Sequence, residues 1–156
     1  MKYVFDSGPL IDLFRHYYPK RFPSLWGKFN SLVASEEIVS VREVYQEISE
    51  RKDALAEWAK EQKDGLFLPS SAEELRFVGT IFEVKHFQAM IHTRKRYKGT
   101  PVADPFVIAR AKILTCAVVT TERFKDNAAG IPNVCKHFKI ECINTEEFMQ
   151  QENWSF

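Results

Sequence analysis

Several carboxylates in this sequence stand at the borders of apolar segments, where side chains from distant parts of a chain can meet. Asp6 directly follows the apolar run 3–5, and Glu122 follows the apolar run 116–120. Asp104 opens an apolar segment that leads into the second of these runs. Carboxylates that converge repel one another, by several kcal/mol at low effective dielectric, unless cations lie between them. Hard oxygen ligands suit Mg²⁺ or Mn²⁺ better than zinc, and two such ions can activate water and stabilise the leaving oxygen in phosphodiester hydrolysis.

A further carboxylate can come from the helix that follows the second predicted strand. Glu43 and Glu47 are four residues apart and share one face of that helix, so either could point toward the same site. An exposed salt bridge from Glu47 to Arg51, worth about 0.3–0.5 kcal/mol, would explain Glu47 without any function. Glu43 could equally lie on a solvated face.

Helix capping competes with metal binding as an explanation of the individual acids. Asp104 before Pro105 has the pattern of a helix N-cap followed by proline at the first helical position. Asp6 could cap the first helix. Asp12, with His16 one turn later, is expected on the surface, although the first helix could also direct it toward the site. Capping and metal binding are compatible, so both interpretations stay open from the sequence.

The elements that would bring these acids together follow from hydrophobic periodicity. Short apolar runs predict strands at 3–5, 38–39, 116–120 and 139–143, with an extended segment at 66–69. Helical spacing predicts helices at 10–14, 24–33, 41–50, 54–63, 73–91, 104–113 and 145–151, with Ser40 as the N-cap of the third. This alternation is typical of an α/β layer fold with a mostly parallel sheet. Because the carboxyl ends of parallel strands share one edge, we expect the acids to meet there.

Length and composition indicate a small folded protein. Its 156 residues fit a single domain, 1–156, and 45% apolar residues including 13 Phe can form a substantial core. The 22 basic and 21 acidic residues nearly cancel, so a polyanionic partner must be met by a local basic patch. Three cysteines are an odd number and indicate free thiols in a reducing compartment, so we expect a cytoplasmic location. No run of about 18 apolar residues occurs, so no membrane contact is expected.

One basic run is the best candidate for contacting RNA. It contains Arg94, Lys95, Arg96, Tyr97 and Lys98. The Lys and Arg side chains could neutralise phosphates beside Asp104, and Tyr97 could stack on an unpaired base. A solvated loop is the alternative interpretation. Arg110 could instead steady the acids from the helix that begins at Asp104.

A second kind of metal site is less well supported. Cys135, His137 and Cys142 carry ligand atoms that zinc can use. Zinc usually takes four ligands, often with a Cys-x-x-Cys pair, and that pair is absent from the sequence. Ordinary thiols are therefore the preferred interpretation.

The order and spacing of four segments resemble those of PIN domains. These segments are Val4-Phe5-Asp6-Ser7, Val44-x-x-Glu47-Ile48, Ala103-Asp104-Pro105-Phe106-Val107-Ile108-Ala109-Arg110-Ala111 and Val118-Val119-Thr120-Thr121-Glu122. The resemblance covers essentially the whole chain and extends to an uncharacterised bacterial PIN-like subgroup with a similar segment at 131–135. It implies a three-layer α/β fold whose central, mostly parallel sheet is flanked by helices.

The same resemblance assigns roles to individual side chains. By position, the four metal-binding acids of the family match Asp6, Glu47, Asp104 and Glu122. The fourth acid of the family is usually Asp, so Asp126 is an alternate for Glu122, and Glu43 is a second alternate. Ser7 and Thr120 match small hydroxyl positions that support the first and last acids.

Family members of the VapC toxin type are metal-dependent ribonucleases. The resemblance therefore implies an Mg²⁺- or Mn²⁺-dependent endoribonuclease that cleaves single-stranded or looped RNA and leaves a 5′-phosphate. It also implies a toxin with a cognate antitoxin protein as its partner, and a homodimer is a further assembly to test. The alternative from another class is a catalytically silent PIN-fold module that binds RNA or protein. A phosphoacceptor receiver domain is disfavoured, because the paired acids and the later Lys that receivers need are not evident.

Overall fold

One parallel sheet forms the centre of the protein. The computed structural model describes residues 1–91 and 102–156. Within these residues, five short strands form the sheet in the order β3-β2-β1-β4-β5, and every adjacent pair is parallel. The strands are β1 (Tyr3–Phe5), β2 (Ile38–Val41), β3 (Phe67–Leu68), β4 (Ala117–Val119) and β5 (Cys142–Ile143).

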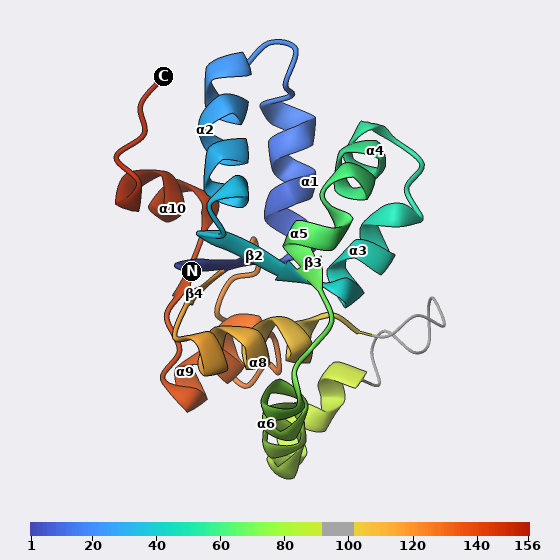
Figure 1. The fold of residues 1–156 in the computed structure, drawn as a ribbon. Helices are drawn as coiled ribbons and strands as arrows, with labels where there is room; N and C mark the ends of the chain where they lie inside the picture. Colours follow the sequence, from blue (N-terminus) through green and yellow to red (C-terminus); the bar gives the residue numbers. More distant parts are fainter. Residues whose placement is uncertain (92–101) are drawn as a thin grey trace.

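Helices cover both faces of this sheet. They are α1 (Ser7–His16), α2 (Pro23–Ala34), α3 (Arg42–Ser49), α4 (Ala54–Glu61), α5 (Lys63–Leu66), α6 (Ala72–Glu83), the 3₁₀ helix η1 (Lys85–Gln88), α8 (Asp104–Leu114), α9 (Ile131–Phe138) and α10 (Thr145–Gln151). Figure 1 shows α1, α2, α4 and α10 on one face of the sheet and α8 and α9 on the other, with α6 packed against α8 on its outer side. The predicted three-layer α/β fold with a parallel sheet flanked by helices is therefore confirmed.

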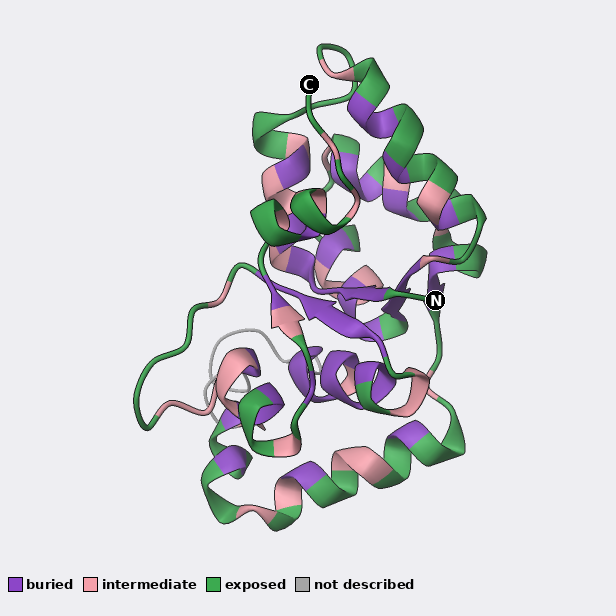
Figure 2. Cartoon of the chain, turned by 90° about the vertical axis from the view of Figure 1, so that its left-hand side faces the viewer, coloured by how far each residue is buried: buried purple, intermediate pink, exposed green. Residues whose placement is uncertain are grey.

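Burial of the strands explains why the sequence forms this sheet. Figure 2 shows the strands as buried elements between helices whose outer faces are exposed. Phe5, Val118 and Val119 are fully buried, as expected for central parallel strands covered on both faces. The ring of Phe5 makes edge contacts with the rings of Phe29 on α2 and Phe148 on α10, at 5.4 and 5.1 Å between centroids. Each such buried ring stabilises the fold by about 1.5–3 kcal/mol.

The strand order indicates where on the carboxyl edge a ligand site is expected. From β1 the chain builds outward through β2 and β3 on one side, and later through β4 and β5 on the other. In open α/β sheets, ligands bind where the strand order reverses, outside the carboxyl ends of the strands. Here that point lies between β1 and β4, the strands that Asp6 and Glu122 follow.

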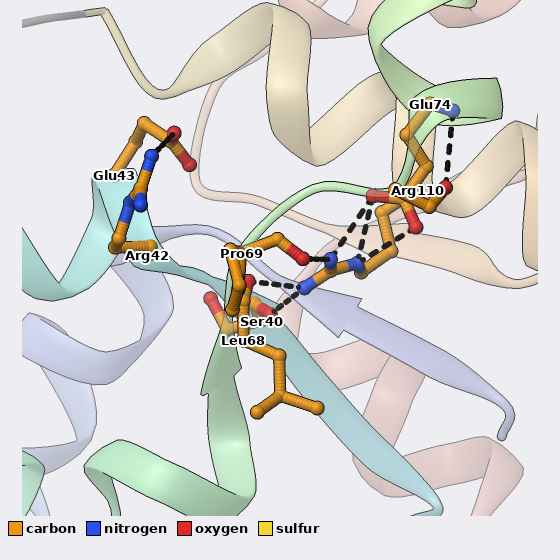
Figure 3. Close-up of polar contacts among 8 residues, drawn as sticks. Ser40, Arg42, Glu43, Leu68, Pro69, Glu74 and Arg110 are labelled. Atoms are coloured by element: carbon orange, nitrogen blue, oxygen red, sulfur yellow. Dashed lines mark hydrogen bonds and ion pairs between the residues drawn. The ribbon is translucent and has the colours of Figure 1, made fainter.

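A buried ion pair fastens α6, α8 and two strands together. Arg110, 5% exposed, donates from Nε to the carboxylate of Glu74 at 3.1 Å, and its Nη2 lies 3.0 Å from the same group. The guanidinium also donates to the carbonyl oxygens of Ser40, Leu68 and Pro69 (Figure 3). The guanidinium of Arg110 therefore binds Glu74 and the backbone of the neighbouring strands. The prediction that it steadies the acids of the site is wrong.

Three local predictions are also wrong. Ser40 is not a helix N-cap, because it lies inside β2 and its hydroxyl donates to the carbonyl of Phe5 at 2.6 Å. The helix predicted at 73–91 breaks at Val84, whose extended backbone turns the chain so that Phe87 packs against α9. The strand predicted at 139–143 is shorter, because Lys139, in a left-handed conformation, ends α9 instead.

No helix in the described part of the chain is long and apolar enough to cross a membrane.

Candidate active site

Asp6 is a buried acid at the carboxyl edge of the sheet, with a hydrogen bond that fixes its side chain. It is 4% exposed and follows β1 directly. Its Oδ2 accepts a hydrogen bond of 3.0 Å from the hydroxyl of Thr120, which follows β4. Asp6 occupies the N-cap position of α1, but its side chain makes no capping hydrogen bond. Its Oδ1 is buried and has no hydrogen-bond partner among the described residues. Capping alone therefore does not explain this carboxylate.

The surroundings of Asp6 raise its pKa from an ordinary 3.8 to about 6. Burial is the largest cause, because it disfavours the charged form. The charges of Glu122 and Glu47 raise the pKa further, whereas hydrogen bonds from the backbone of Ser7 and the hydroxyl of Thr120 lower it. Two of the predicted acids, from two other parts of the chain, therefore act electrostatically on Asp6.

Glu122 is held in place by a helix that the sequence did not reveal. Its backbone N–H donates to the Thr120 hydroxyl at 3.2 Å, and its Oε2 accepts from the backbone N–H of Ile131 at 2.9 Å. Ile131 is the first residue of α9, where an anion is favoured by the helix dipole. The alternate acid, Asp126, is exposed within the loop 121–130 that joins β4 to α9.

Asp104 begins α8 at the same edge of the sheet. It is buried and is the first helical residue, with Ala103 at the N-cap, so the N-cap prediction for Asp104 is wrong. The C-terminus of α8 connects to the start of β4 through two residues, 115–116. Because α8 packs along β1, β2 and β4, its N-terminus with Asp104 points back toward the carboxyl edge.

The two acids of α3 differ in their surroundings. Glu47 is half-buried and raises the pKa of Asp6. Glu43 is 5% exposed, lies in the first turn of α3 (Figure 3), and has a buried Oε2 without a hydrogen-bond partner in the described residues. Its Oε1 lies 3.8 Å from Nη2 of Arg42. Arg51, the alternative partner considered for Glu47, donates from Nε to Asp53 at 2.9 Å.

The carboxylate oxygens are suitable ligands for a hard cation, although the side chains are not arranged as a complete metal site. Among residues 1–91 and 102–156, no group of three or more His, Cys, Asp or Glu side chains has the geometry to hold a metal ion. Asp6 and Glu43 each bury an acceptor oxygen without a donor, which is costly unless a cation or a donor approaches. These oxygens fit Mg²⁺ or Mn²⁺ by type, and the carboxylates would have to draw together to bind the ion.

The zinc ligands considered, Cys135, His137 and Cys142, do not form a three-ligand group either, and the two thiols are free. Cys135 is buried on α9, and Cys142 lies on β5. A hydrogen bond between the two thiols raises the pKa of Cys135, and burial acts in the same direction. The same hydrogen bond lowers the pKa of Cys142. The preference for ordinary thiols in the sequence analysis is consistent with this arrangement.

A hollow of about 860 Å³ adjoins the acids on the β4–β5 side. Thr120, Glu122 and Asp12 line it. Arg123 and Lys136 also line it, and the sequence analysis missed both. Arg123 could have been found by its position next to Glu122. Lys136 could have been found from the helical spacing of Ile131, Val134 and Cys135, which indicates the helix that carries it. The predicted RNA-contact run, 94–98, lies outside the described residues.

Comparison with known proteins identifies a family. No curated protein matches the chain. Among solved structures, the chain is similar to VapBC2 from Rickettsia felis, whose crystal structure was determined bound to a DNA fragment from their promoter. The identity is 16% and the TM-score 0.45, with 92% of this chain and 98% of that chain covered. The family model described as "Domain of unknown function (DUF4411)" matches residues 3–156, and the chain belongs to this family.

Proposed function

We propose that the protein is a divalent-metal-dependent endoribonuclease that hydrolyses single-stranded or looped RNA. The observation that carries this proposal is the environment of Asp6, a buried carboxylate whose pKa is raised to about 6 by burial and by Glu122 and Glu47. A buried acid with a raised pKa at the switch point of a parallel sheet is a candidate for a functional site. The PIN resemblance of the sequence supplies the reaction class.

The proposed roles follow from the position of each side chain. The ions would be held by Asp6, Glu47, Asp104 and Glu122, with Glu43 and Asp126 as alternates. Bound Mg²⁺ or Mn²⁺ would supply Lewis acidity toward the phosphate and lower the pKa of a water molecule. Thr120 orients Asp6 through its hydroxyl, and Ser7 stabilises the charged form of Asp6 through its backbone N–H.

The toxin–antitoxin setting is proposed from the resemblance, and the cytoplasmic location from the three cysteines. We assign the protein to the cytoplasm, as the toxin of a toxin–antitoxin pair whose antitoxin covers the acidic crevice. The run 94–98 would contact the RNA backbone, and a homodimer is the assembly to test first in the absence of an antitoxin.

A catalytically silent RNA-binding or protein-interaction module is the second candidate. It is favoured by the capping of α9 by Glu122, which gives this acid a structural task. It is also favoured by the lack of a preformed three-ligand group in the described residues. This candidate predicts salt-sensitive binding of RNA without cleavage products after long incubation with Mn²⁺.

The deciding experiment compares the cleavage of end-labelled single-stranded RNA with Mn²⁺ and with EDTA. Asp6→Asn and Asp104→Asn should each abolish Mn²⁺-dependent cleavage, because both remove a charge proposed to hold the ions. Asp64→Asn, at an exposed position on α5, is the matched control and should cleave as the wild type does. Undiminished cleavage by both site variants would refute the assignment.

A further inference from the structure

The hollow beside the acids has a second wall with a different chemistry. Its inner side contains Thr120 and Glu122, which belong to the candidate active site. Its outer side contains Arg123, Phe124 and Lys136. A volume of about 860 Å³ lies within the range of ligand-binding sites, so the outer wall can contact whatever occupies the hollow.

The loop 121–130 holds this wall in a fixed position. The two ends of the loop are joined, because the carboxylate of Glu122 near its start accepts a hydrogen bond of 2.9 Å from the backbone N–H of Ile131 just after its end. In its middle, Nδ2 of Asn133 donates to the carbonyl of Lys125 at 2.6 Å. Arg123 and Phe124 therefore project from an anchored segment, although it has no regular secondary structure.

Phe124 is the exposed aromatic ring of this wall. It is 48% exposed, and Nζ of Lys136 lies 4.6 Å from its ring centroid. A cation–π contact of this kind fixes the ring while leaving much of it accessible. Phe124 and Lys136 also line a neighbouring hollow of about 410 Å³, together with His86 and His137. The ring therefore lines two hollows, one of which also contacts Glu122.

Side chains of both charges line the larger hollow. Within residues 1–91 and 102–156, neither Arg123 nor Lys136 is in an ion pair. Four acids also line the hollow, namely Asp12, Glu122, Glu146 and Glu147, and the last two make hydrogen bonds at the start of α10 and within it. Glu147 accepts from the backbone N–H of Asn144 at 2.8 Å, and Glu146 accepts from Gln150 at 3.4 Å. The outer wall therefore offers two available cations around one accessible ring.

We propose that Arg123, Phe124 and Lys136 form a contact site for single-stranded nucleic acid. A base stacks on Phe124, while Arg123 and Lys136 neutralise the flanking phosphates, and the strand continues to the crevice at Asp6. An accessible ring with adjacent cations is how proteins bind unpaired strands without reading their sequence. The direction of the strand rests on the proposed ribonuclease function, whereas the binding itself does not.

The test measures binding where cleavage cannot occur. Fluorescence anisotropy of a labelled oligouridylate, in EDTA at low salt, gives the dissociation constant for the full chain. Phe124→Ala should weaken binding about 10-fold, because stacking of one base is lost, and Phe124→Trp should restore it. Arg123→Gln with Lys136→Gln should flatten the dependence of log K on log salt by roughly 1.4, the value for two phosphate contacts to a single strand.

A similar pair elsewhere on the surface supplies the control. Nζ of Lys28 lies 5.4 Å from the ring centroid of Phe156, which is 61% exposed. Phe156→Ala with Lys28→Gln removes the same chemistry and should leave oligouridylate binding unchanged. The thermal midpoint of unfolding is measured for every variant, so that a loss of binding is not confused with a loss of folding.

The outcomes separate this inference from the proposed function. If the Phe124 and cation variants bind as the wild type does, or if the wild type binds no oligouridylate, the contact site is refuted even when Mn²⁺-dependent cleavage occurs. A site for a protein partner would give that same unchanged binding. If the control pair weakens binding equally, the contact is not local and the inference also fails. If binding responds as expected but the wild type never cleaves, the contact site stands and the ribonuclease proposal falls.

Discussion

The hydroxyl of Thr120 donates a hydrogen bond of 3.0 Å to the carboxylate of Asp6, although the two residues are 114 positions apart in the sequence. Both side chains are buried, and they follow the adjacent parallel strands β4 and β1. The same hydroxyl accepts from the backbone N–H of Glu122 at 3.2 Å. Thr120 therefore connects the first and last acids of the candidate site.

Replacing Thr120 should change the titration of Asp6. Thr120→Val keeps the shape of the side chain but removes the hydrogen bond that favours the charged carboxylate, so the pKa of Asp6 should rise further above its value of about 6. Thr120→Ser should restore the wild-type value. Carbon-13 NMR of the Asp6 carboxyl group, without divalent metal, measures this directly. An unchanged pKa in Thr120→Val would show that the hydroxyl does not act on Asp6.

The raised pKa of Asp6 predicts how stability depends on pH. Between the unfolded value of 3.8 and the folded value of about 6, the folded protein binds more protons than the unfolded chain. In EDTA, the free energy of unfolding should therefore fall as pH rises through this window, by on the order of 3 kcal/mol relative to Asp6→Asn. Urea unfolding at pH 4 and pH 7 measures the difference, and parallel pH curves for the two proteins would contradict it.

Adding Mn²⁺ at neutral pH should offset the destabilisation caused by the charged, buried carboxylate of Asp6. A cation that binds the folded state alone stabilises it by mass action, so the thermal midpoint of the wild type should rise with Mn²⁺ concentration. Asp6→Asn should rise much less, because it lacks one ligand charge. Equal shifts in the two proteins would locate the bound Mn²⁺ elsewhere.

Breaking the Arg110–Glu74 pair should destabilise the fold strongly. Arg110→Met leaves Glu74 buried without its cation, which costs about 3–5 kcal/mol in comparable sites. Arg110→Met with Glu74→Leu should recover part of the loss, because no unpaired charge remains. Arg51→Met, which breaks the more exposed contact with Asp53, should cost about 1 kcal/mol or less. Urea unfolding distinguishes these values, and a small effect of Arg110→Met alone would disprove the role of the buried pair.

The identity of the fourth acid can be decided by amide substitutions. Glu122→Gln keeps an oxygen that can accept from Ile131, so α9 should remain capped while the charge is lost. RNA cleavage should fall at least about 100-fold if each metal ligand contributes as strongly as supporting groups around metal sites do. Asp126→Asn should cleave normally, because Asp126 is exposed. The reverse pattern would assign the fourth position to Asp126.

The parts of the fold that follow local rules could be predicted from the sequence. The strand at 3–5 and the helix that begins at Asp104 appear as predicted, because a short apolar run is typical of a buried strand and Asp104-Pro105 is typical of a helix start. The break at Val84 could not be predicted, since it depends on where Phe87 packs. The partner of Arg110 also could not be predicted. A cation among apolar residues signals that an acid must lie nearby, but not that the acid is Glu74.

For the candidate site, the sequence indicated which acids follow the strands but not how they are held. Asp6 and Glu122 interact because β1 and β4 are neighbours, which is a property of the strand order. The outer wall of the hollow was missed because α9, which carries Lys136, was not predicted, although its buried residues Ile131, Val134 and Cys135 have helical spacing. How the acids are held, and which residues form the outer wall, depend on contacts between helices and strands that residue types alone do not indicate.

The central claim is that these acids together bind divalent cations at the carboxyl edge of the sheet. Anomalous diffraction from crystals of the wild-type protein grown with Mn²⁺ tests it most directly. The account predicts a manganese peak about 2.0–2.3 Å from the carboxylate of Asp6, with oxygens of Asp104 and Glu122 or Glu47 completing the shell. A fully occupied peak remote from Asp6, or no peak at saturating Mn²⁺, would contradict it.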